Sequence, residues 1–159
     1  MNRKFLELVM HPFKFRLYLL AKLPSAFFSG VRVCYVDEEK CVVTVPYKWF
    51  SQNPFKSTYF ACLGMAAEMS TGILAMAQTY RQKPAVSMLV LNIEGSFEKK
   101  ATGLTTFICE DGYRMAQVVK EAIVTGKSTS LTARSVGKNK DGEIVADFTI
   151  TWSFKAKSQ

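Results

Sequence analysis

The sequence predicts an α+β fold in which a curled antiparallel sheet encloses one long helix. Residues 57–80 are apolar or small almost throughout, and runs with strand-like patterns lie before and after them. A helix that is apolar on every side has to be buried, and a sheet has a face to bury, so each can cover the other. We expect one domain over residues 25–159, preceded by a helical extension over residues 1–24.

Residues 1–24 mix apolar side chains with basic ones. We expect Pro12 to open or break the helix that follows and Pro24 to end it. Lys14 and Arg16 interrupt the apolar run, so neither a signal peptide nor a membrane-spanning segment is expected. The side of this helix that we expect to dock on the domain carries Phe13, Leu17 and Leu20. The alternative is a basic helix that makes peripheral contact with a membrane.

Two β-rich runs, 31–36 and 41–45, flank the polar turn at 37–40 and predict a hairpin. A loop with two prolines and several aromatic residues follows and leads into the central helix. Ser57 and Thr58 are the candidate N-cap residues, because a short side-chain oxygen there can accept a free backbone N–H.

Within the central helix, the only charged residue between positions 57 and 80 is Glu68. Its neighbours three, four or seven positions away share its face of the helix. They are Ala61, Gly64, Met65, Thr71, Gly72, Ala75 and Met76. The carboxylate therefore projects from a closely packed face. A transmembrane span at 58–77 is the rival interpretation, but the acid, the two glycines and the strands on both sides argue against it.

The second half of the chain reads mainly as strands. We expect the segment 95–100 to continue into a strand at 102–110. We also expect strands at 86–94, 128–136 and 143–154. The last two are joined by the turn-forming segment 137–142, which predicts a hairpin. Residues 113–124 fit either a short amphipathic helix or a bulged continuation of the sheet, and both remain open.

The net charge of +8 favours anionic partners, namely a phosphorylated cofactor, an anionic membrane or nucleic acid, unless it serves solubility alone. No nucleic-acid-binding motif accompanies the charge, so we expect no such partner. The four cysteines form no CxxC pair and there is one histidine, His11. A metal site, a disulfide framework and a Ser-His-Asp or Cys-His mechanism are therefore not expected, and we place the protein in a reducing cytoplasm.

Three places in the sequence are similar to the hotdog fold and, within it, to the thioesterase-like superfamily. The first is Ser51-Gln52-Asn53 before the helix, with Glu68 fifteen positions after the asparagine. The second is the segment 96–101 between two central strands, and the third is the closing hairpin at 138–146. The resemblance is closest to an uncharacterised branch, a domain of unknown function related to YiiD-type C-terminal domains.

The resemblance implies a protein that acts on an acyl-CoA thioester, or less readily on an acyl-carrier-protein thioester, without a further cofactor. Glu68 would be the general base or nucleophile, and Asn53 would orient water or the carbonyl. Burial would raise the pKa of this carboxyl, and a helix N-terminus from a second subunit would lower it. Structural alternatives are a Glu68 carboxylate hydrogen-bonded to loop backbone and an Asn53 that only forms a turn.

Other roles follow from the same resemblance. The helix N-terminus, whose N–H groups would polarise the thioester carbonyl, reads Tyr59-Phe60-Ala61 where related thioesterases have His-Gly-Gly. The residues expected at the phosphates of coenzyme A are Lys99, Lys100 and Arg134, and those expected at the acyl pocket are Phe60, Met65 and Met69. Solvated lysines and ordinary core methionines are the structural alternatives.

A hotdog sheet has an exposed edge that usually pairs with a second subunit, so we expect a homodimer or a dimer of dimers. A second function class also stays open. In it, the protein is a non-catalytic hotdog module that binds an acyl chain or coenzyme A, associated with a membrane through residues 1–24.

Overall fold

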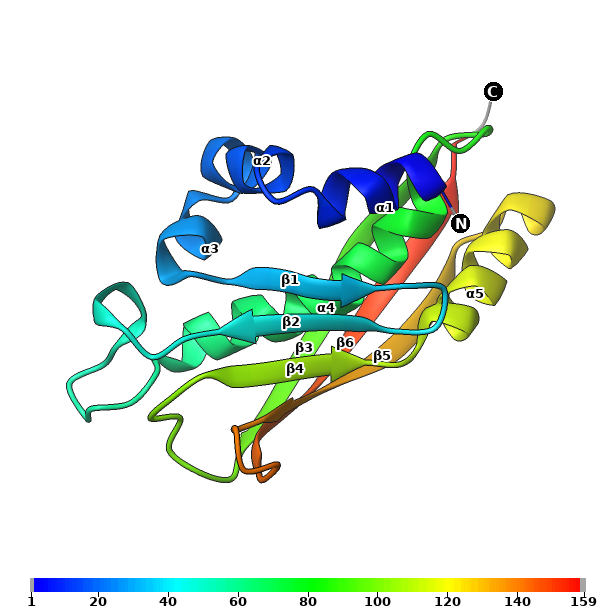
Figure 1. The fold of residues 1–159 in the computed structure, drawn as a ribbon. Helices are drawn as coiled ribbons and strands as arrows, with labels where there is room; N and C mark the ends of the chain where they lie inside the picture. Colours follow the sequence, from blue (N-terminus) through cyan, green and yellow to red (C-terminus); the bar gives the residue numbers. More distant parts are fainter. Residues whose placement is uncertain (1, 158–159) are drawn as a thin grey trace.

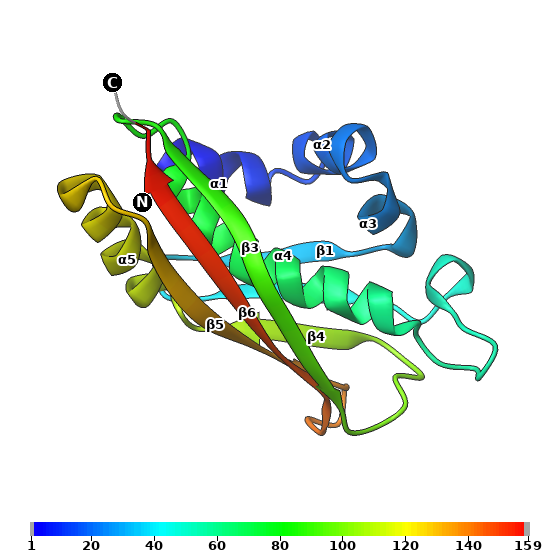
Figure 2. The same ribbon diagram turned by 180° about the vertical axis from the view of Figure 1, so that it is seen from behind.

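The structure, a computed structural model, describes residues 2–157 and has the predicted α+β arrangement. Six strands pair antiparallel in one sheet, in the spatial order β1-β2-β4-β5-β6-β3. They are β1 (Arg32–Val36), β2 (Cys41–Val45), β3 (Val86–Phe97), β4 (Thr105–Cys109), β5 (Thr129–Lys138) and β6 (Ile144–Ala156). Figures 1 and 2 show the sheet curling around the long helix α4 (Phe60–Thr79). Strand β3 therefore forms one open edge of the sheet.

The core lies between α4 and the concave face of the sheet. Residues in β2 and β4 alternate between buried and half-buried, because one face of each strand meets the helix. The Ser70 and Ser135 hydroxyls hydrogen-bond at 2.7 Å and tie α4 to β5. Among the described residues, α4 alone has the length and hydropathy of a membrane span, and 67% of its apolar window is buried in the protein. We therefore interpret α4 as the core helix of the domain.

The predicted N-cap of the central helix is wrong. Helix α4 begins at Phe60 with Tyr59 as N-cap, and no side chain caps it. The Thr58 N–H and hydroxyl instead donate to the Ala101 carbonyl at 2.8 and 3.1 Å. The Ser57 hydroxyl lies 3.1 Å from the amide nitrogen of Asn53. Both candidate caps thus hold the loop that precedes the helix rather than the helix itself.

The N-terminal region folds as three short helices, α1 (Arg3–Met10), α2 (Lys14–Lys22) and α3 (Pro24–Ser29). Pro24 therefore starts a helix as well as following one, as its fixed φ allows at a first helical position. The predicted docking side of α2 is wrong: the side chains buried against the domain are Phe15 and Leu19. The side chains left exposed are Phe13, Leu17 and Leu20. Because α2 is apolar on both sides, periodicity alone could not choose between them.

The second half departs from the prediction in two places. Residues 113–124, left open between helix and strand, lie in helix α5 (Gly112–Thr125), which ends at Gly126 in the left-handed conformation. The strand expected to continue through residues 95–110 is interrupted, because β3 ends at Phe97 and β4 begins at Thr105. The loop between them carries two of the predicted coenzyme A residues, Lys99 and Lys100.

Candidate active site

The Glu68 carboxyl is mostly buried and has no partner within the described part of the chain. Among residues 2–157, no hydrogen bond or ion pair reaches its side-chain oxygens. Burial disfavours the charged form and raises the pKa of this carboxyl above its ordinary value. The structural alternative, a carboxylate bound to loop backbone, is therefore not what the structure shows. An unpaired acid held in an apolar setting is an arrangement that recurs at reactive sites.

Glu68 lines two cavities. The outer cavity, of about 480 Å³, lies between the first half of α4 and strands β3 and β6. Its walls include Phe60, Met65, Ile93 and Phe148. The inner cavity, of about 80 Å³, lies between the second half of α4, α2 and the same two strands, and its lining includes Met69, Met76, Met88 and Tyr18. Glu68 is the one residue that the linings of these two cavities share.

Two of the predicted acyl-pocket residues, Phe60 and Met65, line the outer cavity, and the third, Met69, lines the inner one. The three side chains therefore lie on the two sides of Glu68 and not in one pocket. The inner cavity is closed on one side by Phe15, Tyr18 and Leu23 of the N-terminal region.

Gly72 provides the space that the Glu68 carboxyl occupies. A Cβ at position 72 would lie 3.0 Å from Glu68 Oε1 and 3.3 Å from the Trp152 ring. That ring is fixed, because its N–H donates to the Thr71 hydroxyl at 2.9 Å. The small residue thus allows the carboxyl and the indole to approach the helix closely, which explains a glycine one turn after the acid.

Alanine at positions 64 and 72 should therefore have different effects on stability. In a helix interior, Gly→Ala normally stabilises by roughly 0.5–1 kcal/mol. We expect that gain for Gly64→Ala, whose Cβ would come no closer than 3.8 Å to Phe148, and no gain for Gly72→Ala. Urea unfolding of the two variants measures the difference. An equal gain would show that the Glu68 carboxyl does not lie over Gly72.

The start of α4 provides two unused backbone donors. The Tyr59 N–H donates to the Ser51 carbonyl at 2.7 Å, so it is not available to a ligand. Within the described residues, the N–H groups of Phe60 and Ala61 have no acceptor, as expected for the first positions of a helix. Phe60 and Ala61 both line the outer cavity. The predicted anion-stabilising role is thus open to Phe60 and Ala61 and blocked at Tyr59.

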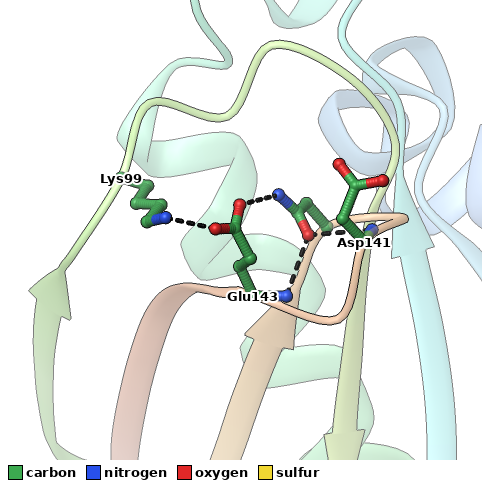
Figure 3. Close-up of polar contacts among 4 residues, drawn as sticks. Lys99, Asp141 and Glu143 are labelled. Carbon is green, nitrogen blue, oxygen red and sulfur yellow. Dashed lines mark hydrogen bonds and ion pairs between the residues drawn. The ribbon is translucent and has the colours of Figure 1, made fainter.

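A groove of about 570 Å³ adjoins the outer cavity, and Phe60 and Phe97 line both. Lys99 and Lys100 lie along it. Lys99 forms an ion pair with Glu143, as Figure 3 shows. The Glu143 carboxylate also accepts a hydrogen bond from the Asn139 side-chain amide. These contacts lower the pKa of the Glu143 carboxyl, with the Lys99 hydrogen bond as the larger cause.

The three predicted phosphate-binding residues are not equivalent in the structure. Lys100 has no ion-pair partner in the part of the chain that the structure describes, whereas the charge of Lys99 is shared with Glu143. Arg134, on β5, donates through Nε to both Asp147 oxygens at 3.0 Å and does not line the groove. Of the three, Lys100 is the most available to an anion.

The structure does not bring Asn53 to Glu68. Asn53 lines the groove, and Glu68 lines the two cavities. The Asn53 side-chain oxygen accepts the N–H groups of Phe55 and Ser57 at 2.9 and 3.2 Å, which shapes the loop. Its predicted role in orienting water or the carbonyl stays a prediction, and the structure shows Asn53 as a turn residue.

The strands contribute cavity walls that were not predicted from the sequence. The residues missed are Met88, Ile93, Gly95, Phe97, Phe148 and Trp152. One signal was present, because a glycine within a strand pattern often marks a close approach. At Gly95, a Cβ would lie 2.5 Å from the Phe148 ring, which occupies that space.

Comparisons with known proteins agree with this fold. Residues 15–154 match the family described as "Domain of unknown function (DUF4442)". No curated protein matches the chain. A solved structure from Pseudomonas aeruginosa, described as a protein of unknown function and "Probable Thioesterase", is similar with a TM-score of 0.76 and 19% identity, covering 92% of this chain and 97% of that one.

Two further solved structures are similar. One, of unknown function and from Chlorobaculum tepidum, has a TM-score of 0.76 and 16% identity over 91% of this chain and 93% of its own. The other, a thioesterase from Haemophilus influenzae, has a TM-score of 0.61 and 12% identity over 88% of each chain. At these identities the likeness establishes the fold, and the predicted hotdog fold is confirmed.

Proposed function

We propose that this chain, which belongs to the family described as "Domain of unknown function (DUF4442)" and to the thioesterase-like hotdog superfamily, hydrolyses an acyl-CoA thioester with Glu68 as its base. One observation carries the proposal. Glu68, with a mostly buried and unpartnered carboxyl, lines two apolar cavities, one of which adjoins a groove that carries lysines. A carboxylate without a protein partner is free to take a proton from water.

The three spaces match the three parts of an acyl-CoA. The inner cavity, apolar and lined by methionines, suits the end of the acyl group; its volume of about 80 Å³ has room for roughly three heavy atoms. The outer cavity suits the thioester and the rest of the acyl group. The groove suits the nucleotide end, whose phosphates would meet Lys100 and Lys99. Arg134 would act only at longer range.

The reaction follows from the groups present. The Glu68 carboxylate accepts a proton from water as the water oxygen attacks the thioester carbonyl. The negative charge that develops on the carbonyl oxygen is stabilised by unused N–H groups of a helix N-terminus. The C–S bond then breaks, the proton moves from Glu68 to the sulfur, and the products are a carboxylic acid and the coenzyme A thiol. Direct attack by the Glu68 oxygen is the other route, and labelled water in a single turnover distinguishes them.

The spacing along α4 supports a site shared between two protomers. Ala61 and Glu68 are seven residues apart, which is about 10 Å along a helix axis, too far for both to act on one carbonyl. The N–H donors for one Glu68 would therefore come from another copy. Strand β3 is an open edge with exposed apolar side chains, Leu89, Leu91 and Ile93 among them, and such edges favour pairing.

Leu91→Lys is expected to convert a dimer into a monomer and to abolish hydrolysis, because a charge on an edge strand opposes pairing. Light scattering measures the mass, circular dichroism checks the fold, and thiol release measures activity. Val124→Lys is the matched control, because Val124 is an exposed apolar residue on α5, away from the edge. A monomeric wild type, or a monomeric variant with full activity, would contradict the two-protomer site.

A non-catalytic hotdog module that binds an acyl chain or coenzyme A is the second candidate. The observation in its favour is the N-cap: Tyr59 stands where related thioesterases have the first residue of His-Gly-Gly, and its N–H is already bonded to Ser51. Fewer donors for the oxyanion weaken catalysis without preventing binding.

A hydrolysis screen tests the proposal. The wild-type protein is incubated with short, long and aromatic acyl-CoAs, and the free thiol is measured, with coenzyme A binding followed by calorimetry. We expect thiol release above the uncatalysed rate for at least one acyl class. Binding of coenzyme A without thiol release from any ester would establish the second candidate instead.

A further inference from the structure

One end of the molecule exposes a group of large apolar side chains that the active site does not use. They come from α2, from α3 and from the short 3-10 helix η1 (Trp49–Ser51). We call the group the α2–η1 surface, and its members are Phe13, Leu17, Leu20, Phe28, Trp49 and Phe50. Phe13 and Trp49 are three-quarters exposed (75% and 74%), whereas most large apolar residues of a soluble domain are at least partly covered.

The α3 and η1 members of the α2–η1 surface touch one another through their aromatic rings. The Phe28 ring lies 5.4 Å from that of Phe50, and the Phe50 ring lies 4.6 Å from that of Trp49. On the other side, Phe27 links α3 to α2, because the Arg16 guanidinium lies 4.1 Å above its ring and donates to its carbonyl. Figures 1 and 2 both show α2, α3 and the loop after β2 along the same end of the molecule.

The charges around this surface are all of one sign. Neither residues 8–36 nor residues 40–67 contain an aspartate or a glutamate. The exposed lysines in these segments are Lys14, Lys22, Lys48 and Lys56, and none forms an ion pair within the described residues. A partner for this surface must therefore combine an apolar interior with a negatively charged boundary.

We propose that the α2–η1 surface docks on an anionic lipid bilayer. Aromatic and leucine side chains interleaved with lysines suit the boundary between acyl chains and headgroups, where the rings enter the boundary and the lysines meet lipid phosphates. A second copy of this chain fits less well, because it would bring the same positive charges. The open edge at β3 already offers a separate surface for a second copy. The proposal does not depend on catalysis.

Vesicle sedimentation with the full chain tests the proposal. The vesicles contain phosphatidylcholine alone or with phosphatidylglycerol. We expect sedimentation with the anionic vesicles only, weakened by salt.

Leu17→Ser with Leu20→Ser should weaken vesicle binding roughly tenfold or more. Lys14→Glu with Lys22→Glu should weaken it at least 30-fold, since each lysine contributes about a factor of five near such a membrane. Val124→Ser, on α5, is the matched control and should bind as the wild type does.

Tryptophan fluorescence locates the contact. Trp49 is exposed and Trp152 is buried, so vesicles should shift the emission of Trp49 to shorter wavelength. Trp49→Phe should retain sedimentation and lose the shift. Absence of wild-type sedimentation, equal sedimentation of the α2 variants and the control, or an unshifted Trp49 emission would overturn the proposal. A reduced mass of the α2 variants in light scattering would also overturn it, because the surface would then join copies of the chain.

Discussion

Glu68→Gln is expected to lower kcat for acyl-CoA hydrolysis by about 10²–10⁴-fold, the usual contribution of a positioned general base. Glutamine has nearly the same shape and cannot accept the proton, so substrate binding should change little. Glu121→Gln is the matched control, because Glu121 is exposed on α5 and lines neither cavity. Thiol release from the best substrate measures both variants. Similar rates for wild type and Glu68→Gln would remove Glu68 from the reaction.

The same substitution should make the protein more stable at neutral pH. In the folded protein the pKa of Glu68 is raised by burial, so between the unfolded and folded pKa values the folded state binds more protons. The folded state therefore loses stability relative to the unfolded state as pH rises through that interval. The Glu68→Gln variant lacks this cost, and we expect its free energy of unfolding to exceed that of the wild type by on the order of 1 kcal/mol at pH 7. The gain should disappear below pH about 4, where glutamate is protonated in both states.

Gly112→Ala is expected to destabilise the fold by about 3 kcal/mol or more. Gly112 starts α5 against the β1–β2 turn, where its N–H donates to the Glu39 carbonyl at 2.9 Å. A Cβ there would lie 2.2 Å from the Glu38 carbonyl oxygen. This contact is with backbone, so no side-chain rotation relieves it, and the helix must move off the turn.

Thermal unfolding measures this effect, and the melting temperature should fall by about 6–12 °C. Gly103→Ala is the matched control, since a Cβ at that position would have no atom within 4 Å, and it should leave the melting temperature almost unchanged. Equal melting temperatures for the two variants would mean that α5 does not rest on the β1–β2 turn.

Local pattern was enough to predict the architecture. The central helix was recognisable because an apolar stretch with one acid can only be buried, and the hairpins because alternation and turn residues are local signals. The position of Glu68 on a close-packed face also followed from its helical spacing, and Gly72 beside it proved to be the residue that makes room.

The errors occurred where several partners were available to one segment. Helix α2 is apolar on two sides, so the sequence could not show that Phe15 and Leu19, rather than Phe13 and Leu17, face the core. Thr58 resembles an N-cap in the sequence, but its hydroxyl donates a hydrogen bond to the Ala101 carbonyl, 43 residues away. The strand walls of the cavities depend in the same way on pairing between distant segments, for which a single sequence carries little signal.

The pH dependence of kcat/KM for the best acyl-CoA tests the role of Glu68 most directly, because it reports the pKa of the essential base in the free enzyme. We predict that activity falls at low pH with an apparent pKa above the ordinary glutamate value, as burial requires, and that the residual activity of Glu68→Gln lacks this limb. An acid limb that persists in Glu68→Gln would contradict the account.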